Sequence, residues 1–292
     1  MTALTALFAL ATSLLWGLAD FGGGLLTRRF PALTVVVVSQ ALAVLVLGTV
    51  VLATGAWHEA GPLLWYAVAA GVVGPAAMLA FYKALALGPM GVVSPLGSLG
   101  VVVPVSVGLL LGDRPGLAQF AGIGVAVFGV VLAGGPELRG APVQRQAVLL
   151  TLVAAFGFGA VMALIAEAST TLTGLFLALF VQRVTNVAVG GGALWLSVRR
   201  GGRALPEGGG GLRAVLAVLP ALAFVGLADV AANGTYALAA QRGPVTVAAV
   251  LASLYPVVTA VAARGVLKER LRAVQAAGAG LALVGTVLLA TG

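Results

Sequence analysis

The chain contains no cysteine, a single histidine and few charged residues. The lack of cysteine excludes disulfides and thiol chemistry, and with one histidine we expect no transition-metal site. Charged residues make up 8% of the chain, whereas a soluble domain carries about 25%. No Walker A loop, Ser-His-Asp set or paired-carboxylate motif is present. We therefore expect no cofactor and no enzymatic activity.

The chain consists largely of long apolar stretches. Hydrophobic residues make up 61% of the chain, and the mean hydropathy is +1.15. The stretches are continuously apolar and close to the ~20 residues that a helix needs to cross a bilayer, whereas a spanning strand needs only ~9–11. The sequence thus predicts an all-α membrane protein with ten transmembrane helices. They are expected at residues 4–26, 32–54, 62–87, 90–111, 117–134, 146–168, 173–198, 213–240, 244–266 and 271–291.

The sequence also repeats itself. The spacing Gly-x-Gly-x4-Gly occurs at residues 122–129 and again at 278–285, displaced by 156 positions. The repeat predicts two five-helix units, residues 1–140 and 141–292. Because five is odd, the second unit must cross the membrane in the opposite sense, as in the inverted repeats of secondary transporters. The glycines predict close packing of the fifth and tenth helices on a neighbour, with each other as one candidate partner.

Lysine and arginine are divided unevenly between the two ends of the predicted helices. The connections after the odd-numbered helices, with the adjoining helix ends, hold Arg28, Arg29, Lys83, Arg139, Arg145, Arg199, Arg200, Arg203, Arg213, Arg264, Lys268, Arg270 and Arg272. The opposite face holds Arg114 and Arg242. The positive-inside rule places the basic loops in the cytoplasm and both termini outside. The net charge of +8 is thus explained by membrane orientation, and we expect no nucleic-acid partner.

Several short motifs resemble one transporter family. They are Leu15-Trp16-Gly17, Tyr82-x-Ala84-Leu85, Tyr236-Ala237-Leu238, the stretches 253–260 and 267–271, and looser first-copy counterparts at 95–99 and 111–114. In order, spacing and duplication they resemble ten-helix, EamA-type members of the drug/metabolite transporter superfamily. Asp20 departs from the family pattern, which often has Asn there, and the charge count reverses the family's usual orientation.

Apart from the basic residues at the helix ends, four charged side chains within the predicted helices are candidates for function: Asp20, Glu167, Arg183 and Asp229. Each costs about 2.5–3.5 kcal/mol on insertion and therefore needs a reason to be there. Arg183 and Asp229 either hold a charged or zwitterionic substrate in a polar cavity or form a structural ion pair between two helices. Asp20 either exchanges a proton or binds a cation, or else it caps the helix near the interface. Asp20 and Asp229 are the candidates for proton coupling.

Neutral polar and aromatic residues share faces with these charges. Proline and hydroxyl residues in the fourth and ninth helices, around Pro95 and Pro256, predict interrupted helices beside a binding site, with a kink used only for packing as the alternative. The candidate cavity residues are Trp16, Asp20, Tyr82, Ser94, Ser98, Gln182, Arg183, Asn186, Asp229, Asn233, Tyr236, Ser253 and Tyr255.

The resemblance implies a secondary active transporter of a bacterial-type inner membrane. We expect it to export small metabolites, such as amino acids and related compounds, or drugs by alternating access, with protons as a candidate coupling ion. Its partners would be the lipid bilayer and a small-molecule substrate, with the chain a monomer or homodimer. A membrane-embedded enzyme or a lipid-handling scaffold is the alternative, and a channel is a third possibility.

The charge asymmetry makes a direct prediction about orientation. A reporter enzyme active only in the periplasm, fused to the C-terminus, should be active, because thirteen basic residues hold the opposite face in the cytoplasm. A reporter active only in the cytoplasm should be silent at the same position. The reverse pattern would contradict the predicted orientation.

Overall fold

The structure is a computed structural model that describes residues 3–101, 103, 116–133, 144–168, 171–206, 211–242, 251–252, 254–268 and 273–291. Its elements are helical throughout this part of the chain. The first half contains α1 (Ala3–Thr27), α2 (Ala32–Thr54), η1 (Ala56–Glu59), α3 (Leu64–Leu87), α4 (Met90–Gly97), η2 (Ser98–Val101) and α6 (Leu117–Ala133). The second half contains α7 (Arg145–Ala168), α8 (Leu172–Arg199), α9 (Gly211–Ala217), α10 (Leu219–Arg242), α12 (Tyr255–Leu267) and α13 (Ala273–Thr291).

The membrane character of the chain is confirmed. Within the described residues, 6 helices are long and apolar enough to cross a bilayer, and three shorter apolar helices accompany them. The long ones are α1, α2, α3, α7, α8 and α10. The expected fourth, fifth, ninth and tenth spans lie partly outside the described residues, so the count of ten stays a prediction.

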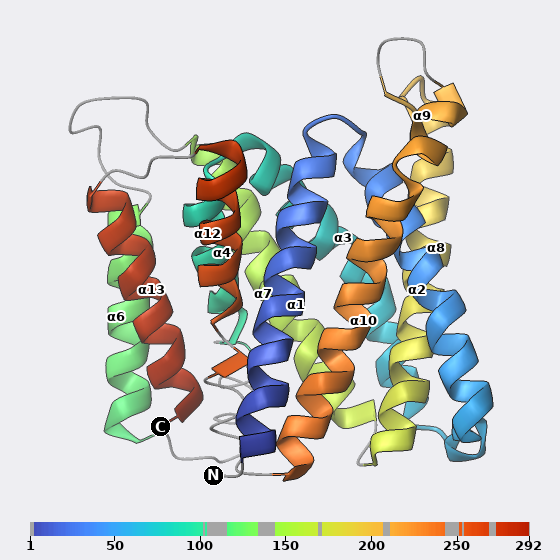
Figure 1. Ribbon diagram of the computed structural model, residues 1–292, viewed down its shortest axis with the longest axis horizontal. Helices are drawn as coiled ribbons and strands as arrows, with labels where there is room; N and C mark the ends of the chain where they lie inside the picture. Colours follow the sequence, from blue (N-terminus) through green and yellow to red (C-terminus); the bar gives the residue numbers. More distant parts are fainter. Residues whose placement is uncertain are drawn as a thin grey trace.

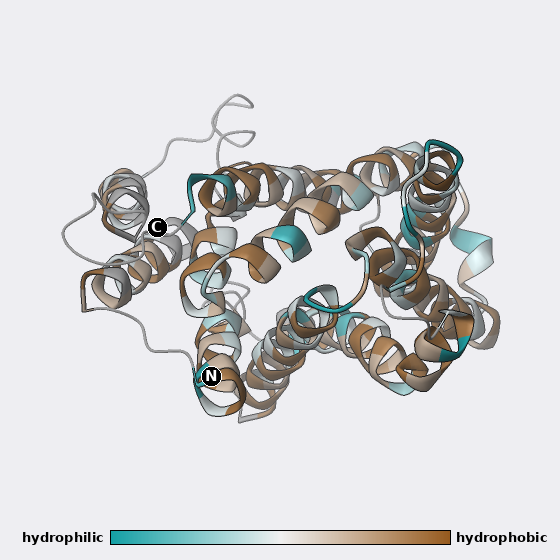
Figure 2. Ribbon diagram, turned by 90° about the horizontal axis from the view of Figure 1, so that it is seen from above, coloured by the Kyte–Doolittle hydropathy of each residue, from teal (hydrophilic) through white to brown (hydrophobic). Residues whose placement is uncertain are grey.

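The helices stand side by side with their axes roughly parallel (Figure 1). α3 packs against α7 and α8, α1 against α10 and α12, and α2 against α8 and α10. α6 and α13 form a pair at one edge of the bundle, as the view from above also shows (Figure 2). The described ends of α1 and α13 nearest the termini lie at the same end of the bundle (Figure 1).

One hydrophobic core joins α1, α2, α3, α4 and α10. Its buried residues include Leu26, Val35, Leu85, Met90 and Leu222. These positions lie near the C-terminal ends of α1 and α3 and the N-terminal ends of α2, α4 and α10. The core therefore packs the bundle tightly at the end where α1 finishes.

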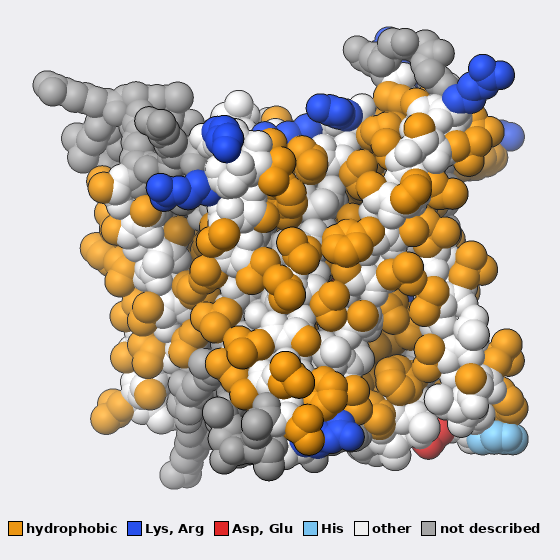
Figure 3. Space-filling model, in the orientation of Figure 1, with side chains coloured by type: hydrophobic (Ala, Val, Ile, Leu, Met, Phe, Trp, Pro, Cys, Tyr) orange, Lys and Arg blue, Asp and Glu red, His pale blue; other side chains and the backbone are white. Residues whose placement is uncertain are grey.

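Basic side chains gather at that same end (Figure 3). Arg28 and Arg29 follow α1, Arg199 ends α8, and Lys268 caps α12. Arg242, at the last residue of α10, lies at the opposite end. The structure thus groups the basic residues as the sequence predicts, while which end faces the cytoplasm stays a prediction.

Three expected spans are interrupted within the described residues. The eighth, expected at 213–240, is divided by a turn at Val218 into α9 and α10. The other two interruptions lie in the fourth and ninth spans. α4 contains Pro95 and gives way at Ser98 to the 3-10 helix η2. In the second half, a turn at Leu254 precedes α12, which begins at Tyr255 with Pro256 in its first turn. Proline lacks the N–H that would continue the hydrogen-bond ladder, which accounts for a break at each of these two places.

The glycine rows provide the contact between α6 and α13. A side chain at Gly129 would meet the backbone of Gly278 and Ala282, whereas one at Gly124 would meet nothing within 4 Å. Backbones that approach this closely exclude any side chain from the seam. The expected close packing is confirmed where Gly129 meets Gly278 and Ala282, with α6 and α13 as each other's partners, whereas Gly124 and Gly280 face open space.

This seam predicts a difference between two glycines of one helix. Gly129→Ala should destabilise the protein by about 1–3 kcal/mol because its methyl group would collide with the backbone of α13. Gly124→Ala is the matched control and should leave stability unchanged or slightly higher. Thermal unfolding in detergent measures both, and equal stability of the two variants would contradict the packing.

Candidate functional site

A cavity of about 300 Å³ lies inside the bundle. α1, α3, α7, α8 and α10 contribute most of its wall, and residues beside the interruptions in the fourth and ninth spans complete it. The lining residues are Trp16, Ala19, Asp20, Gly74, Met78, Phe81, Tyr82, Gly97, Ser98, Gly100, Phe158, Val161, Met162, Ile165, Leu179, Gln182, Arg183, Asn186, Asp229, Asn233, Tyr236, Ala252 and Tyr255. Interrupted helices beside a central cavity are typical of secondary-transporter binding sites.

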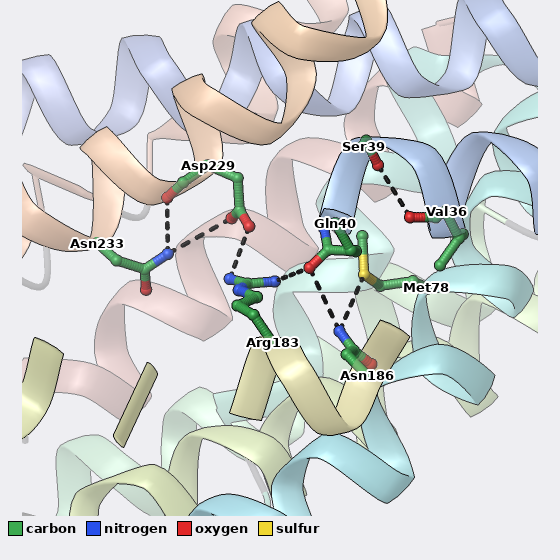
Figure 4. Close-up of polar contacts among 8 residues, drawn as sticks. All are labelled: Val36, Ser39, Gln40, Met78, Arg183, Asn186, Asp229 and Asn233. Atoms are coloured by element: carbon green, nitrogen blue, oxygen red, sulfur yellow. Dashed lines mark hydrogen bonds and ion pairs between the residues drawn. The ribbon is translucent and has the colours of Figure 1, made fainter. Parts of the chain in front are cut away.

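An ion pair forms the polar centre of this wall (Figure 4). Arg183 on α8 places Nη2 2.6 Å from Oδ2 of Asp229 on α10. Its Nη1 donates to Oε1 of Gln40 on α2 at 2.5 Å, and the same oxygen accepts from Nδ2 of Asn186 at 3.3 Å. The sulfur of Met78 also accepts from Nδ2 of Asn186, at 3.8 Å. One guanidinium thus connects three helices, and the amide of Asn186 extends the network to α3.

Asn233 supports the acid of this pair. Its Nδ2 donates to the backbone oxygen of Asp229 at 2.7 Å and, more weakly, to Oδ1 at 3.4 Å. The two residues are one helical turn apart, which places their side chains on the same face of α10. The Asp229 carboxylate therefore has a partner on each side and is held in one orientation.

Three aromatic rings meet on the wall beside α1. The Trp16 ring lies 6.1 Å from that of Tyr236 and 6.1 Å from that of Tyr255, the latter edge-on. α12 is tied to α1 because Oγ1 of Thr259 donates to the backbone oxygen of Gly17 at 3.0 Å. A side chain at Gly17 would collide with Tyr255 and Val258. The glycine therefore lets α12 approach and places Tyr255 beside Trp16.

Asp20 lies one helical turn beyond Trp16 and lines the same cavity. Within the described residues its carboxylate has no hydrogen bond and no ion pair, although it lies close enough to Asp229 for the two charges to interact. The helix-cap alternative does not fit, since α1 continues to Thr27. Asp20 is an acid of the cavity without a neutralising partner.

α7 contributes an apolar wall that sequence reasoning missed. Phe158, Val161, Met162 and Ile165 line the cavity at the spacing of one helix face. Phe158 meets Phe81 of α3 edge-on, with ring centres 5.5 Å apart. No signal separates these residues from lipid-facing ones, because both kinds are apolar. Gln40 was also missed, although it is the one amide within the apolar run of α2.

All but two of the predicted cavity residues line this single cavity. Ser94 does not: it is fully buried in α4, where its hydroxyl has no hydrogen-bond partner within the described residues. Ser253 lies outside the described residues. Glu167 is exposed near the end of α7 and His58 is exposed in η1, both away from the cavity.

The fold and the cavity together define an α-helical membrane protein with a polar site enclosed by its helices. The model of the EamA-like transporter family matches residues 3–135 and 145–291. The chain therefore belongs to the EamA-like transporter family, which assigns it a transporter-type function rather than catalysis.

Solved structures add support at the level of the fold. One described as "Crystal structure of protein" matches with a TM-score of 0.56 and 18% identity, covering 98% of this chain and 96% of that chain. No curated protein matches the chain.

The ion pair makes a prediction about stability. Arg183→Met should cost at most about 3–5 kcal/mol, the range for a fully buried pair, because it leaves the carboxylate of Asp229, whose side chain is 21% exposed, uncompensated. The double variant Arg183→Met/Asp229→Asn should recover much of this loss, because no charge remains unpaired. Thermal unfolding of the single and double variants in detergent measures the coupling. Losses that simply add would show that the pair contributes nothing.

Proposed function

We propose that this protein is a secondary active transporter that exports small metabolites, such as amino acids and related compounds, or drugs. Its two halves, residues 1–140 and 141–292, would be inverted five-helix repeats that enclose the cavity. Three observations support this: the family matches in two segments, each half has an interrupted helix beside the cavity, and the cavity is lined from both halves. Transport would proceed by alternating access around this cavity.

The packing supports a definite conformational state. The hydrophobic core, with Leu85, Met90 and Leu222, lies between the cavity and the basic end of the bundle. A substrate in the cavity therefore has no path through this end until the core residues separate. With the basic end in the cytoplasm, as the charge count predicts, this is the state closed to the cytoplasm.

Proton coupling is supported by the position of Asp20. A carboxylate without a partner is costly in a membrane interior, so it must be neutralised by a proton or by a bound cation. The charged groups that share its cavity are Asp229 and Arg183, and these already pair with each other. A proton and a cationic group of the substrate would therefore compete for Asp20, which links transport to the pH gradient.

Replacement of Asp20 tests this coupling. A compound screen in cells with and without the protein first supplies a substrate. In vesicles, uptake of that substrate by the unaltered protein should follow an imposed pH gradient, and Asp20→Asn should abolish this dependence because the amide binds no proton near neutral pH.

Glu167→Gln is the matched control, since it removes one carboxylate from an exposed position of α7 outside the cavity. It should retain the pH dependence. Unchanged coupling in Asp20→Asn would remove Asp20 from the mechanism, and loss of coupling in both variants would show that the effect is not specific to the cavity.

A further inference from the structure

The cavity has an unequal charge balance. Two carboxylates, Asp20 and Asp229, and one guanidinium, Arg183, lie on its wall in the described part of the chain. The Arg183–Asp229 pair neutralises itself at 2.6 Å. What remains for a ligand is the negative charge of Asp20.

Arg183 is poorly placed to receive a carboxylate from a ligand. Its two terminal nitrogens are occupied by Asp229 and Gln40, and its Nε, which has no hydrogen-bond partner within the described residues, is inaccessible. The side chain is only 9% exposed. Moving it toward a ligand would leave Asp229 uncompensated, at a cost comparable to breaking a buried pair.

The surroundings of Asp20 suit a cation. Trp16, one helical turn away on α1, lies in a cluster with Tyr236 and Tyr255, with ring centres 6.1 Å from each. Faces of Trp and Tyr rings attract ammonium groups, most strongly where water is excluded. A carboxylate that shares a cavity with these rings, one helical turn from Trp16, is a favourable place for an alkylammonium group.

Buried amide oxygens point to the same ligand chemistry. Gln182 and Asn186 line the cavity, are 3% and 2% exposed, and have Oε1 and Oδ1 without hydrogen-bond partners within the described residues. Buried acceptors without partners are rare because each costs free energy. Both oxygens are inaccessible in this state, as are the donors Arg183 Nε and Gln40 Nε2, also unpartnered in this part of the chain, so a ligand N–H would satisfy the oxygens only after these side chains rearrange.

The cavity wall formed by α7 and α3 indicates the chemistry of the rest of the ligand. Phe158, Val161, Met162 and Ile165 of α7, with Phe81 and Met78 of α3, present apolar surface to the cavity. The volume of about 300 Å³ admits a body of the size of one aromatic ring system.

We infer that the cavity selects amphipathic organic cations, amines with an apolar body and no carboxylate, over amino acids and carboxylic acids of the same shape. The inference rests on the proposed transport function and narrows its substrate class. An α-carboxylate next to the ammonium group would meet Asp20, and the described lining offers no cation other than the paired Arg183 to balance it.

Matched ligands test this charge selection on the purified protein in detergent, by calorimetry and by thermal stabilisation. Each set keeps one body and changes the charge: phenethylamine, phenylalanine and phenylpropionate, and tryptamine, tryptophan and indolepropionate. In each set the amine should bind about 30-fold or more tightly than the other two, the ratio expected when a buried charge pair is gained or lost. Equal or tighter binding of the amino acid or the acid, or no binding of either amine, would overturn the inference.

Two variants in the cavity, with one control outside it, test whether Asp20 is the origin of the preference for amines. Asp20→Asn should remove most of the preference for the amine, whereas Glu167→Gln, outside the cavity, should keep it. Asp229→Asn frees a terminal nitrogen of Arg183 and should improve binding of phenylpropionate. An amine preference that survives Asp20→Asn would overturn the assignment to Asp20.

These experiments distinguish failure of the binding inference from failure of the transport proposal. Amines that bind through Asp20 but are not moved across vesicles would contradict the transporter proposal and leave the charge selection intact. Amino acids that are transported in preference to amines would support the transporter and overturn the charge selection.

Discussion

The ion pair between Arg183 and Asp229 sets how the helices of the second half are arranged and how that half contacts the first half of the chain. In a membrane interior neither charge is stable alone, so α8 and α10 must present them to each other. Gln40 then brings α2 into the same network, because its amide oxygen accepts from both Arg183 and Asn186. Three helices are thereby fixed in register around one side of the cavity. This arrangement leaves Asp20 without a cationic partner, because the pair occupies the one guanidinium that the described residues contribute to the cavity.

Glycine provides the second constraint, because it decides how closely the helices approach this network. A side chain at Gly74 would meet the amide of Asn186, and one at Gly23 would meet the ring of Tyr82. Membrane helices associate largely through close packing, so these positions set which side chains face inward. α1 packs on α3, α10 and α12. Its small residues make those contacts, and Trp16 and Asp20 are left to line the cavity.

The sequence predicted the polar half of the site well and the apolar half not at all. A charged or amide side chain in a membrane helix is costly, so Arg183, Asp229 and Asn186 could be singled out without any coordinates. Phe158 and Ile165 could not, because an apolar side chain is equally stable against lipid and against a cavity. Ser94 shows the converse error: a hydroxyl near a proline suggested a lining position, but α4 turns it into the packed interior. The interruptions in the fourth and ninth spans were predictable because Pro95 and Pro256 remove backbone donors, whereas the change to a 3-10 helix at Ser98 depends on packing.

The position of the interruptions connects the site to motion. Ser98 follows the end of α4 and Tyr255 begins α12, and both line the cavity. α4 and α12 also pack against each other. A ligand that contacts residues at both breaks touches the places where backbone hydrogen bonds are already missing, so reorientation there disrupts fewer bonds than bending an intact helix. Neutralisation of Asp20, on α1 beside the break at Tyr255, removes the charge that opposes closure of the cavity. We therefore propose that binding at Asp20 and movement at the two breaks are coupled through the cavity itself.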